Sequence, residues 1–238
     1  CPFHDDRNPS LMVSTDKQIY KCFPCGAGGN AISFLMAIEK ISFPEAVRRL
    51  ALRAGISLPE SREDEFQKGT FDVLYQVCEW AAGFYRGLLT KDRRGERSRA
   101  YLTHRGVPDD VASLFSLGYS LSDWDGLLLA AAKRSLDPPT LEKAGLALPR
   151  RSGGGHYDRF RDRLIFPITG ATGRVVAFGG RSLGEGEDPK YINSPETPVY
   201  HKGGVLYGLW QAKDAIRNRG ETLVVEGYMD LIRLVGAG

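Results

Sequence analysis

Two short stretches near the start of the chain, Cys1-Pro2-Phe3-His4 and Cys22-Phe23-Pro24-Cys25, decide the fold of its first part. In each stretch two residues separate a pair of metal ligands, so both side chains of one tight turn can point at one ion. Together the pairs supply three thiolates and one imidazole, a ligand set typical of tetrahedral zinc. Because protein fills all four positions, the zinc is expected to be structural and to supply much of the folding free energy.

The alternative is that these residues are ordinary thiols and a surface histidine. The paired spacing favours the metal site, and four cysteines in 238 residues are too few for a small disulfide-stapled secreted domain. The 17 residues between His4 and Cys22 are enough for a hairpin that brings the two pairs together, with strands predicted at residues 11–13 and 18–20.

Two helices are predicted after the second pair. The first covers residues 31–39, and the second begins with a capping box, Ser42 with Glu45, and stops near Gly55. The polar residues 59–69 then predict an exposed linker between two folding units. The first domain is therefore expected at residues 1–58.

The rest of the chain predicts a mixed α+β core, so the whole is expected to be an α+β multidomain protein. A long amphipathic helix should start at Phe71, and short helices should follow to about residue 144. Residues 164–168 and 175–178 predict a hairpin with its turn at 169–173. Near the end, residues 222–225 predict a buried strand, and Tyr228 onward predicts a helix.

Composition indicates a soluble globular protein, because 42% of the residues are hydrophobic and 26% are charged. No apolar run is long enough to span a membrane, and no signal peptide is evident. The net charge of +3 is too small to argue for nucleic acid unless the charge is concentrated in one place.

The positive charge is in fact concentrated. Between Arg159 and Arg181 five arginines face one acidic residue, a local charge of +4. Arg159, Arg161 and Arg163 alternate in steps of two, so an extended strand would place them on one face. Such a row favours phosphate, which arginine binds bidentately, and the alternative is a solvated edge guarded by charges.

Longer blocks of sequence extend both patterns. Asn8-Pro9-Ser10 and Tyr20-Lys21-Cys22-Phe23-Pro24-Cys25-Gly26, with the first ligand pair, resemble the Cys-His-Cys-Cys zinc ribbon of bacterial DnaG-type DNA primases. Residues 157–168, 173–181 and 189–197 resemble the basic half of the polymerase core in the same family. The two sets share no residues, so they support the resemblance independently.

The resemblance implies roles for particular residues. Basic and polar residues of the core would line the path of template, primer strand or incoming nucleoside triphosphate: Arg105, Arg159, Arg161, Arg163, Arg181, Lys190, Tyr191, Asn193 and Lys202. The ribbon would help to recognise the template through Arg7, Lys17, Tyr20, Lys21 and Phe23. A simpler alternative is that Tyr20 and Phe23 only cover the small core of the ribbon.

Two acidic residues near the end of the chain are candidate catalytic residues. Glu226 would lie at the carboxyl end of the predicted strand, and Asp230 would lie four residues on, near the same rim. Alone, Glu226 could equally cap a helix. It also resembles the first acidic motif of a Toprim subdomain, whose glutamate holds catalytic Mg²⁺ (or Mn²⁺) with a later Asp-x-Asp pair that does not follow here.

The resemblance therefore implies residues 70–218 as the basic part of the polymerase core and 219–238 as the start of a truncated Toprim subdomain. Its activity would be synthesis of short RNA primers from ribonucleoside triphosphates on single-stranded DNA, and this chain alone would be inactive. The replicative helicase would dock on a C-terminal domain absent here. The protein would be a cytoplasmic monomer at the bacterial nucleoid and replication fork.

Two other functions stay open on the sequence. One is a non-catalytic module that holds single-stranded DNA, as in a primase relative from a mobile element. The other is a Toprim nuclease or topoisomerase, which shares Glu226 but leaves residues 158–168 and 189–197 without an explanation.

Overall fold

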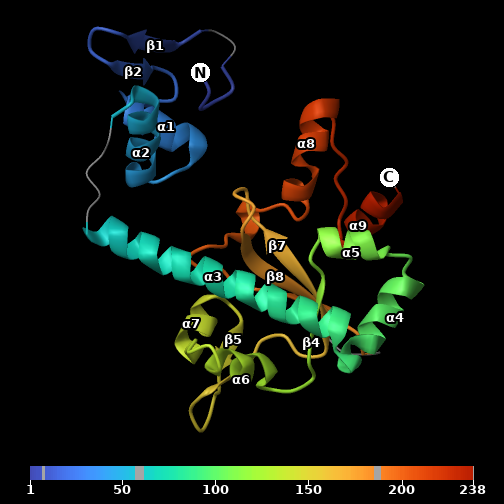
Figure 1. Ribbon diagram of the computed structural model, residues 1–238. Coiled ribbons are helices and arrows are strands. Elements are labelled where there is room, and N and C mark those ends of the chain that lie inside the picture. Colours follow the sequence, from blue (N-terminus) through green and yellow to red (C-terminus); the bar gives the residue numbers. More distant parts are fainter. Residues whose placement is uncertain (7–8, 57–61, 185–188, 238) are drawn as a thin grey trace. The chain divides into compact units, whose positions relative to one another are not determined.

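The computed structural model describes residues 1–6, 9–56, 62–184 and 189–237 (Figure 1). The chain forms two compact units, Cys1–Glu65 and Phe66–Gly238. No helix in the described part is both long enough and apolar enough to cross a membrane.

The first unit is a three-stranded antiparallel sheet followed by two helices. Its elements are β1 (Leu11–Ser14), β2 (Ile19–Cys22), β3 (Gly28–Asn30), α1 (Ala31–Glu39) and α2 (Phe43–Ala54), with strand order β1-β2-β3. The predicted hairpin and both predicted helices are confirmed. The core is small and aromatic, because the ring of Tyr20 lies 5.7 Å from that of Phe3 and 5.0 Å from that of Phe34.

The start of α2 differs from the prediction. Ser42 occupies the N-cap position, but its side chain makes no capping hydrogen bond. Glu45 instead accepts hydrogen bonds from Arg48 and Arg49, so the predicted capping box is not formed. The end of α2 agrees with the prediction, because Gly55 adopts the left-handed conformation that closes many helices.

The second unit is organised by α3 (Arg62–Lys91), which begins earlier than predicted. Residues 62–69 of the predicted linker are helical, because arginine, glutamate, glutamine and lysine in this stretch are good helix formers. Residues 57–61 lie outside the described residues. Short helices follow: η1 (Arg93–Gly95), α4 (Glu96–His104), α5 (Asp109–Leu114), α6 (Gly126–Ala132) and α7 (Pro138–Lys143).

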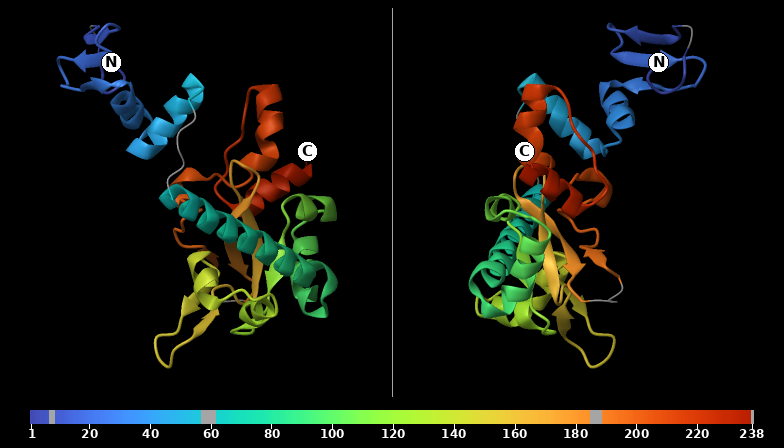
Figure 2. Two further views of the ribbon diagram at one scale, coloured as in Figure 1. Left: turned by 60° about the vertical axis from the view of Figure 1, so that its left-hand side comes forward. Right: turned by 90° about the vertical axis from the view of Figure 1, so that its right-hand side faces the viewer.

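An antiparallel sheet forms the centre of this unit. Its order is β4-β7-β8-β9, with β4 (Gly118–Ser120), β7 (Arg163–Thr169), β8 (Val175–Ser182) and β9 (Tyr191–Asn193). The β7–β8 hairpin confirms the predicted one. A separate hairpin of β5 (Ala147–Pro149) and β6 (His156–Asp158) extends away from the sheet (Figure 2).

Helix α3 lies across one face of the sheet (Figures 1 and 2). Its buried Tyr85 packs edge-on against Phe178 of β8, with ring centroids 5.8 Å apart. Strand β4 approaches the same helix closely, since a Cβ on Gly118 would lie 2.5 Å from the Cβ of Tyr85. This contact requires glycine at position 118, in a strand that forms one edge of the sheet.

The last elements are η2 (Lys202–Gly204), α8 (Leu209–Arg219) and α9 (Tyr228–Ala237). The predicted buried strand at residues 222–225 is wrong, because this segment is irregular and Leu223 and Val224 are each 80% exposed. A strand needs a neighbouring backbone to satisfy its N–H and C=O groups. None of the described strands pairs with this segment, so Leu223 and Val224 stay exposed.

Candidate zinc site and nucleic-acid interface

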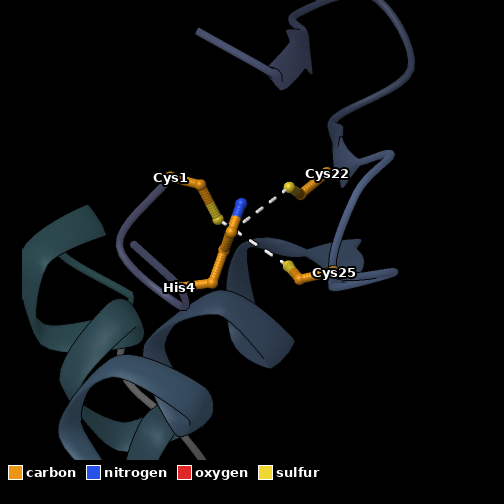
Figure 3. Close-up of side chains that lie close together, drawn as sticks. All are labelled: Cys1, His4, Cys22 and Cys25. Atoms are coloured by element: carbon orange, nitrogen blue, oxygen red, sulfur yellow. Dashed lines mark hydrogen bonds between the residues drawn. The ribbon is translucent and has the colours of Figure 1, made fainter. Parts of the chain in front are cut away.

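The four predicted zinc ligands converge at one point of the first unit (Figure 3). The Sγ atoms of Cys1 and Cys25 are 3.9 Å apart, and the Sγ of Cys22 is 3.8 Å from the Nδ1 of His4. All four ligand atoms lie within 4.8 Å of one another. Ligands on a tetrahedral zinc with bonds of 2.3 Å are about 3.8 Å apart, so these side chains form a structural zinc site.

The carboxylate of Asp6 lies near Nε2 of His4, the ring nitrogen that is not beside Cys22. Asp6 lies 3.8 Å from the Nε2 of His4 and accepts a hydrogen bond of 2.6 Å from the hydroxyl of Ser10. The hydrogen bond from Ser10 holds the pKa of Asp6 below its ordinary value. An anionic partner for Nε2 leaves Nδ1 facing the sulfur atoms, the usual arrangement behind a zinc-bound histidine.

The outer surface of the ribbon carries the residues predicted to meet the template. Phe23, Lys17 and Lys21 are exposed, and the ring of Phe23 is 70% accessible to solvent. Tyr20 is buried in the aromatic core instead, so for this residue the simpler alternative holds. Arg7 lies outside the described residues.

In the second unit a groove of about 780 Å³ gathers residues from widely separated segments. It is lined by six of the residues singled out from the sequence: Arg105, Arg181, Tyr191, Asn193, Glu226 and Asp230. Arg105 ends α4, whereas Arg181, Tyr191 and Asn193 come from β8 and β9. The groove therefore brings two basic side chains into the same lining as both predicted catalytic carboxylates.

Several polar atoms of this groove are buried without a hydrogen-bond partner among the described residues. They are the Nε atoms of Arg105 and Arg181 and the hydroxyl of Tyr207. The Nη1 of Arg181 donates to the hydroxyl of Tyr191 at 2.6 Å. An unpaired buried polar group costs free energy, and burial keeps these two Nε atoms from direct contact with a ligand in the groove.

Asn193 is held from two sides in the wall of the groove. The hydroxyl of Tyr228 donates to its Oδ1 at 2.8 Å. Nε and Nη2 of Arg159 donate to its main-chain oxygen at 3.1 and 2.7 Å. Burial raises the pKa of Tyr228 to about 12, so its hydroxyl stays a donor at neutral pH. Arg159 is therefore engaged within the protein.

The predicted row of three arginines on one strand face is wrong. Strand β6 ends at Asp158 and β7 begins at Arg163, and between them Asp162 adopts a left-handed conformation with φ of 46°. The side chain of Arg163 is buried and donates to the main-chain oxygens of Gly180 and Pro189 at 3.3 and 3.1 Å. The bend turns the three guanidinium groups to different partners.

Arg161 belongs to an aromatic cluster that the sequence reasoning missed. Its guanidinium lies 4.3 Å from the ring centre of Trp124 and 5.2 Å from that of Tyr157. The indole of Trp124 is 56% exposed. The basic-aromatic block around Tyr157 and Arg161 was visible in the sequence, but nothing there paired it with a tryptophan more than thirty residues earlier.

The remaining predicted residues lie outside the groove lining. Lys190 follows residues 185–188, which the structure leaves undescribed, and Lys202 begins η2; both are exposed. The two predicted catalytic carboxylates of the groove lining are exposed, with Glu226 just before α9 and Asp230 in its first turn. In the described part of the chain no further Asp, Glu, His or Cys completes a metal site with these two carboxylates.

Comparison with known proteins agrees with both units. Residues 84–213 match the family model of the DNA primase catalytic core, N-terminal domain, and residues 1–66 match the CHC2 zinc finger. The DNA primases of Halalkalibacterium halodurans and Pseudomonas putida are each 45% identical to the whole chain, which covers 40% and 36% of their lengths. The chain thus spans about two fifths of these relatives.

Two solved structures are similar over much of the chain. The Aquifex aeolicus primase, with zinc-binding and RNA polymerase domains, is 38% identical with a TM-score of 0.63, covering 99% of this chain and 56% of that one. A DnaG primase catalytic domain bound to single-stranded DNA is 37% identical with a TM-score of 0.63, covering 71% of this chain and 52% of that one.

Proposed function

This chain belongs to the bacterial DnaG-type DNA primase family, and we propose that it forms the front part of an enzyme that copies single-stranded DNA into short RNA primers. The observation that carries the proposal is the groove, where Arg105 and Arg181 lie in the same lining as Glu226. Guanidinium groups suit phosphate oxygens, so the ligand of this groove would be a ribonucleoside triphosphate.

Glu226 and Asp230 fit a role in holding a divalent metal, because both carboxylates are exposed on the groove and Mg²⁺ prefers oxygen ligands. Bound Mg²⁺ or Mn²⁺ would neutralise phosphate charge and activate the attacking hydroxyl. Gly227 supports this role, since a Cβ there would lie 2.8 Å from the Oδ2 of Asp230 and would displace it. Further ligands would come from residues beyond this chain.

Single-stranded template would bind on the aromatic cluster and on the ribbon. Trp124 and Arg161 offer a stacking face beside a cation, the pairing that recognises unpaired bases and their phosphates. Phe23, Lys17 and Lys21 repeat this chemistry on the zinc ribbon. The relative with bound single-stranded DNA supports the assignment of this ligand class.

The other partners follow from the same proposal. Primer RNA would occupy the groove with the template, and the replicative helicase would contact a C-terminal domain outside these residues. We place the working protein in the bacterial cytoplasm, at the nucleoid, as a monomer. Residues 1–58 would form the zinc domain, 59–69 a linker, 70–218 the basic core and 219–238 the start of the Toprim subdomain.

The test is template-dependent primer synthesis by the polypeptide extended to the length of its relatives. Glu226→Gln should lower kcat by at least about 100-fold, because the metal loses a ligand. Glu221→Gln, an exposed glutamate five residues earlier that does not line the groove, is the matched control and should keep full activity. Equal activity of both variants would remove Glu226 from the mechanism.

The 238-residue chain alone gives a second test. It should bind single-stranded DNA with an affinity that falls as salt rises. It should make no primers, since its described residues complete no metal site with Glu226 and Asp230. Primer synthesis by this chain alone would contradict the proposed division of the active site.

A further inference from the structure

In the side-chain amide of Asn193, the oxygen is hydrogen-bonded and the nitrogen has no partner among the described residues. Its Oδ1 accepts the hydrogen bond from Tyr228, whereas its Nδ2 has no partner among the described residues. An amide nitrogen carries two N–H donors and cannot accept a hydrogen bond. Because Asn193 lines the groove, this nitrogen presents donors to whatever ligand the groove holds.

The position of Tyr228 is set by packing that does not depend on its hydroxyl. Its ring stacks on Phe166 at 5.0 Å, with an interplanar angle of 13°, and meets Tyr207 edge-on at 4.6 Å. Strand β8 leaves room for it, since a Cβ on Gly179 would lie 2.8 Å from this ring. In the sheet register Gly179 pairs directly with Asn193, so the missing side chain opens the path from Tyr228 to the amide.

The backbone of Asn193 is fixed separately. Arg159 donates two hydrogen bonds to its main-chain oxygen, and the next residue, Ser194, exchanges hydrogen bonds with Phe178 of β8. The main chain and the amide of Asn193 are therefore each held by a different residue. Arg159 and the hydroxyl of Tyr228 can therefore affect ligand binding through Asn193 without contacting the ligand themselves.

We propose that Tyr228 and Arg159 are positioning residues that hold Asn193 so that its Nδ2 donates to an oxygen of the nucleoside triphosphate in the groove. The proposal rests on the proposed function and deepens it. It gives Arg159 a role different from the nucleic-acid contact expected from the sequence. It also links the segment of Glu226 to β9, because Tyr228 lies two residues after that glutamate and bonds to Asn193.

The test is a double-mutant cycle in the extended polypeptide, measured as KM for ribonucleoside triphosphate during primer synthesis. Tyr228→Phe removes only the hydroxyl, so it should raise KM roughly fivefold while kcat stays within about twofold. Asn193→Ala should raise KM at least as much. The double variant should match Asn193→Ala alone, because Tyr228 acts through Asn193.

Tyr119→Phe is the matched control. It also removes a tyrosine hydroxyl that donates a hydrogen bond of 2.8 Å, here to Asp162, and Tyr119 does not line the groove. It should leave KM unchanged alone and in combination with Asn193→Ala. Arg159→Lys keeps the charge but loses the two-point contact, and should raise KM without changing the affinity for single-stranded DNA.

Three outcomes would overturn the proposal: additive effects of Tyr228→Phe and Asn193→Ala, an unchanged KM in Tyr228→Phe, or a loss of DNA affinity in Arg159→Lys that accounts for its defect. A structural defect is recognised separately, because it would lower the melting temperature of Tyr228→Phe and would add to every other variant. If the wild-type protein makes no template-dependent primers, the proposed function fails first and the cycle is not reached.

Discussion

The carboxylate of Asp158 binds the backbone N–H of Leu127 at 2.6 Å, joining the end of β6 to the start of α6 across 31 residues of sequence. Its second oxygen accepts from the N–H of Leu128 at 3.1 Å, and its own N–H donates to the carbonyl of Trp124 at 2.7 Å. This one residue therefore places the tryptophan of the aromatic cluster beside Arg161. Its protonation state has a measurable consequence.

Burial raises the pKa of Asp158 to about 6, from an ordinary value of 3.8. An acid with a raised pKa in the folded state binds its proton more tightly there than in the unfolded state. Its contribution to stability is therefore complete below pH 4 and is lost as the pH rises towards 6. The unfolding free energy should fall over this window by up to roughly 3 kcal/mol on account of this group.

Asp158→Asn isolates this effect, because it removes the titration. Chemical unfolding at a series of pH values should show the wild type exceeding the variant by the largest margin near pH 4, with the margin shrinking towards pH 7. Two curves that stay parallel across this range would show that Asp158 does not titrate in the folded protein.

Zinc removal should unfold the first unit alone. The ribbon has only a small aromatic core, so a strong chelator should abolish its amide protection, whereas the second unit has its own buried core and should keep its melting temperature. Elemental analysis of Cys22→Ser should show less than one zinc per chain. Cys78→Ala, which alters a buried thiol of the second unit, should retain full zinc content.

Trp124→Ala should weaken binding of single-stranded DNA by roughly 5- to 100-fold, the range expected for one lost stacking contact. The salt dependence should keep its slope, because no charge is removed. Phe43→Ala is a suitable control, since this ring is 57% exposed, close to the 56% of Trp124, but no described cation stacks on it. A fluorescence anisotropy titration with a labelled oligonucleotide would reveal equal losses if aromatic exposure alone mattered.

Two glycines should respond to alanine in opposite directions. Gly179→Ala would place a methyl group 2.8 Å from the ring of Tyr228 and should destabilise the second unit by about 1–3 kcal/mol. Gly83→Ala lies inside α3 with nothing within 4 Å of its Cβ, and should stabilise by up to about 1 kcal/mol. Urea unfolding of both variants measures the two effects, and the same sign for both would contradict the assigned packing.

Sequence patterns predicted best those structural features that depend on residues close together in the chain. The zinc ligands followed from spacing because each pair lies within one turn, and α1 and α2 followed from periodicity and from Gly55. The residues of the groove were predicted mainly from the resemblance to the primase family, because they come from segments far apart in the sequence. Trp124 carried no signal, because its partner Arg161 is reached only after the chain bends at Asp162.

The errors have a common physical origin. Residues 222–225 have strand composition, but a strand also needs a partner, and none of the described strands provides one. Arg159, Arg161 and Arg163 alternate as a strand would, but hydrogen bonds to main-chain oxygens hold all three in place within the protein. Composition alone contains neither piece of information.

The dispersed origin of the groove has a consequence for how the protein matures. Its lining runs from Arg105 to Leu231, so no nascent chain shorter than this can offer the complete pocket. A small molecule that fills it would recognise only the finished fold and would raise the melting temperature by mass action. Thermal-shift screening against this pocket would therefore report on completed folding and on ligand fit in a single measurement.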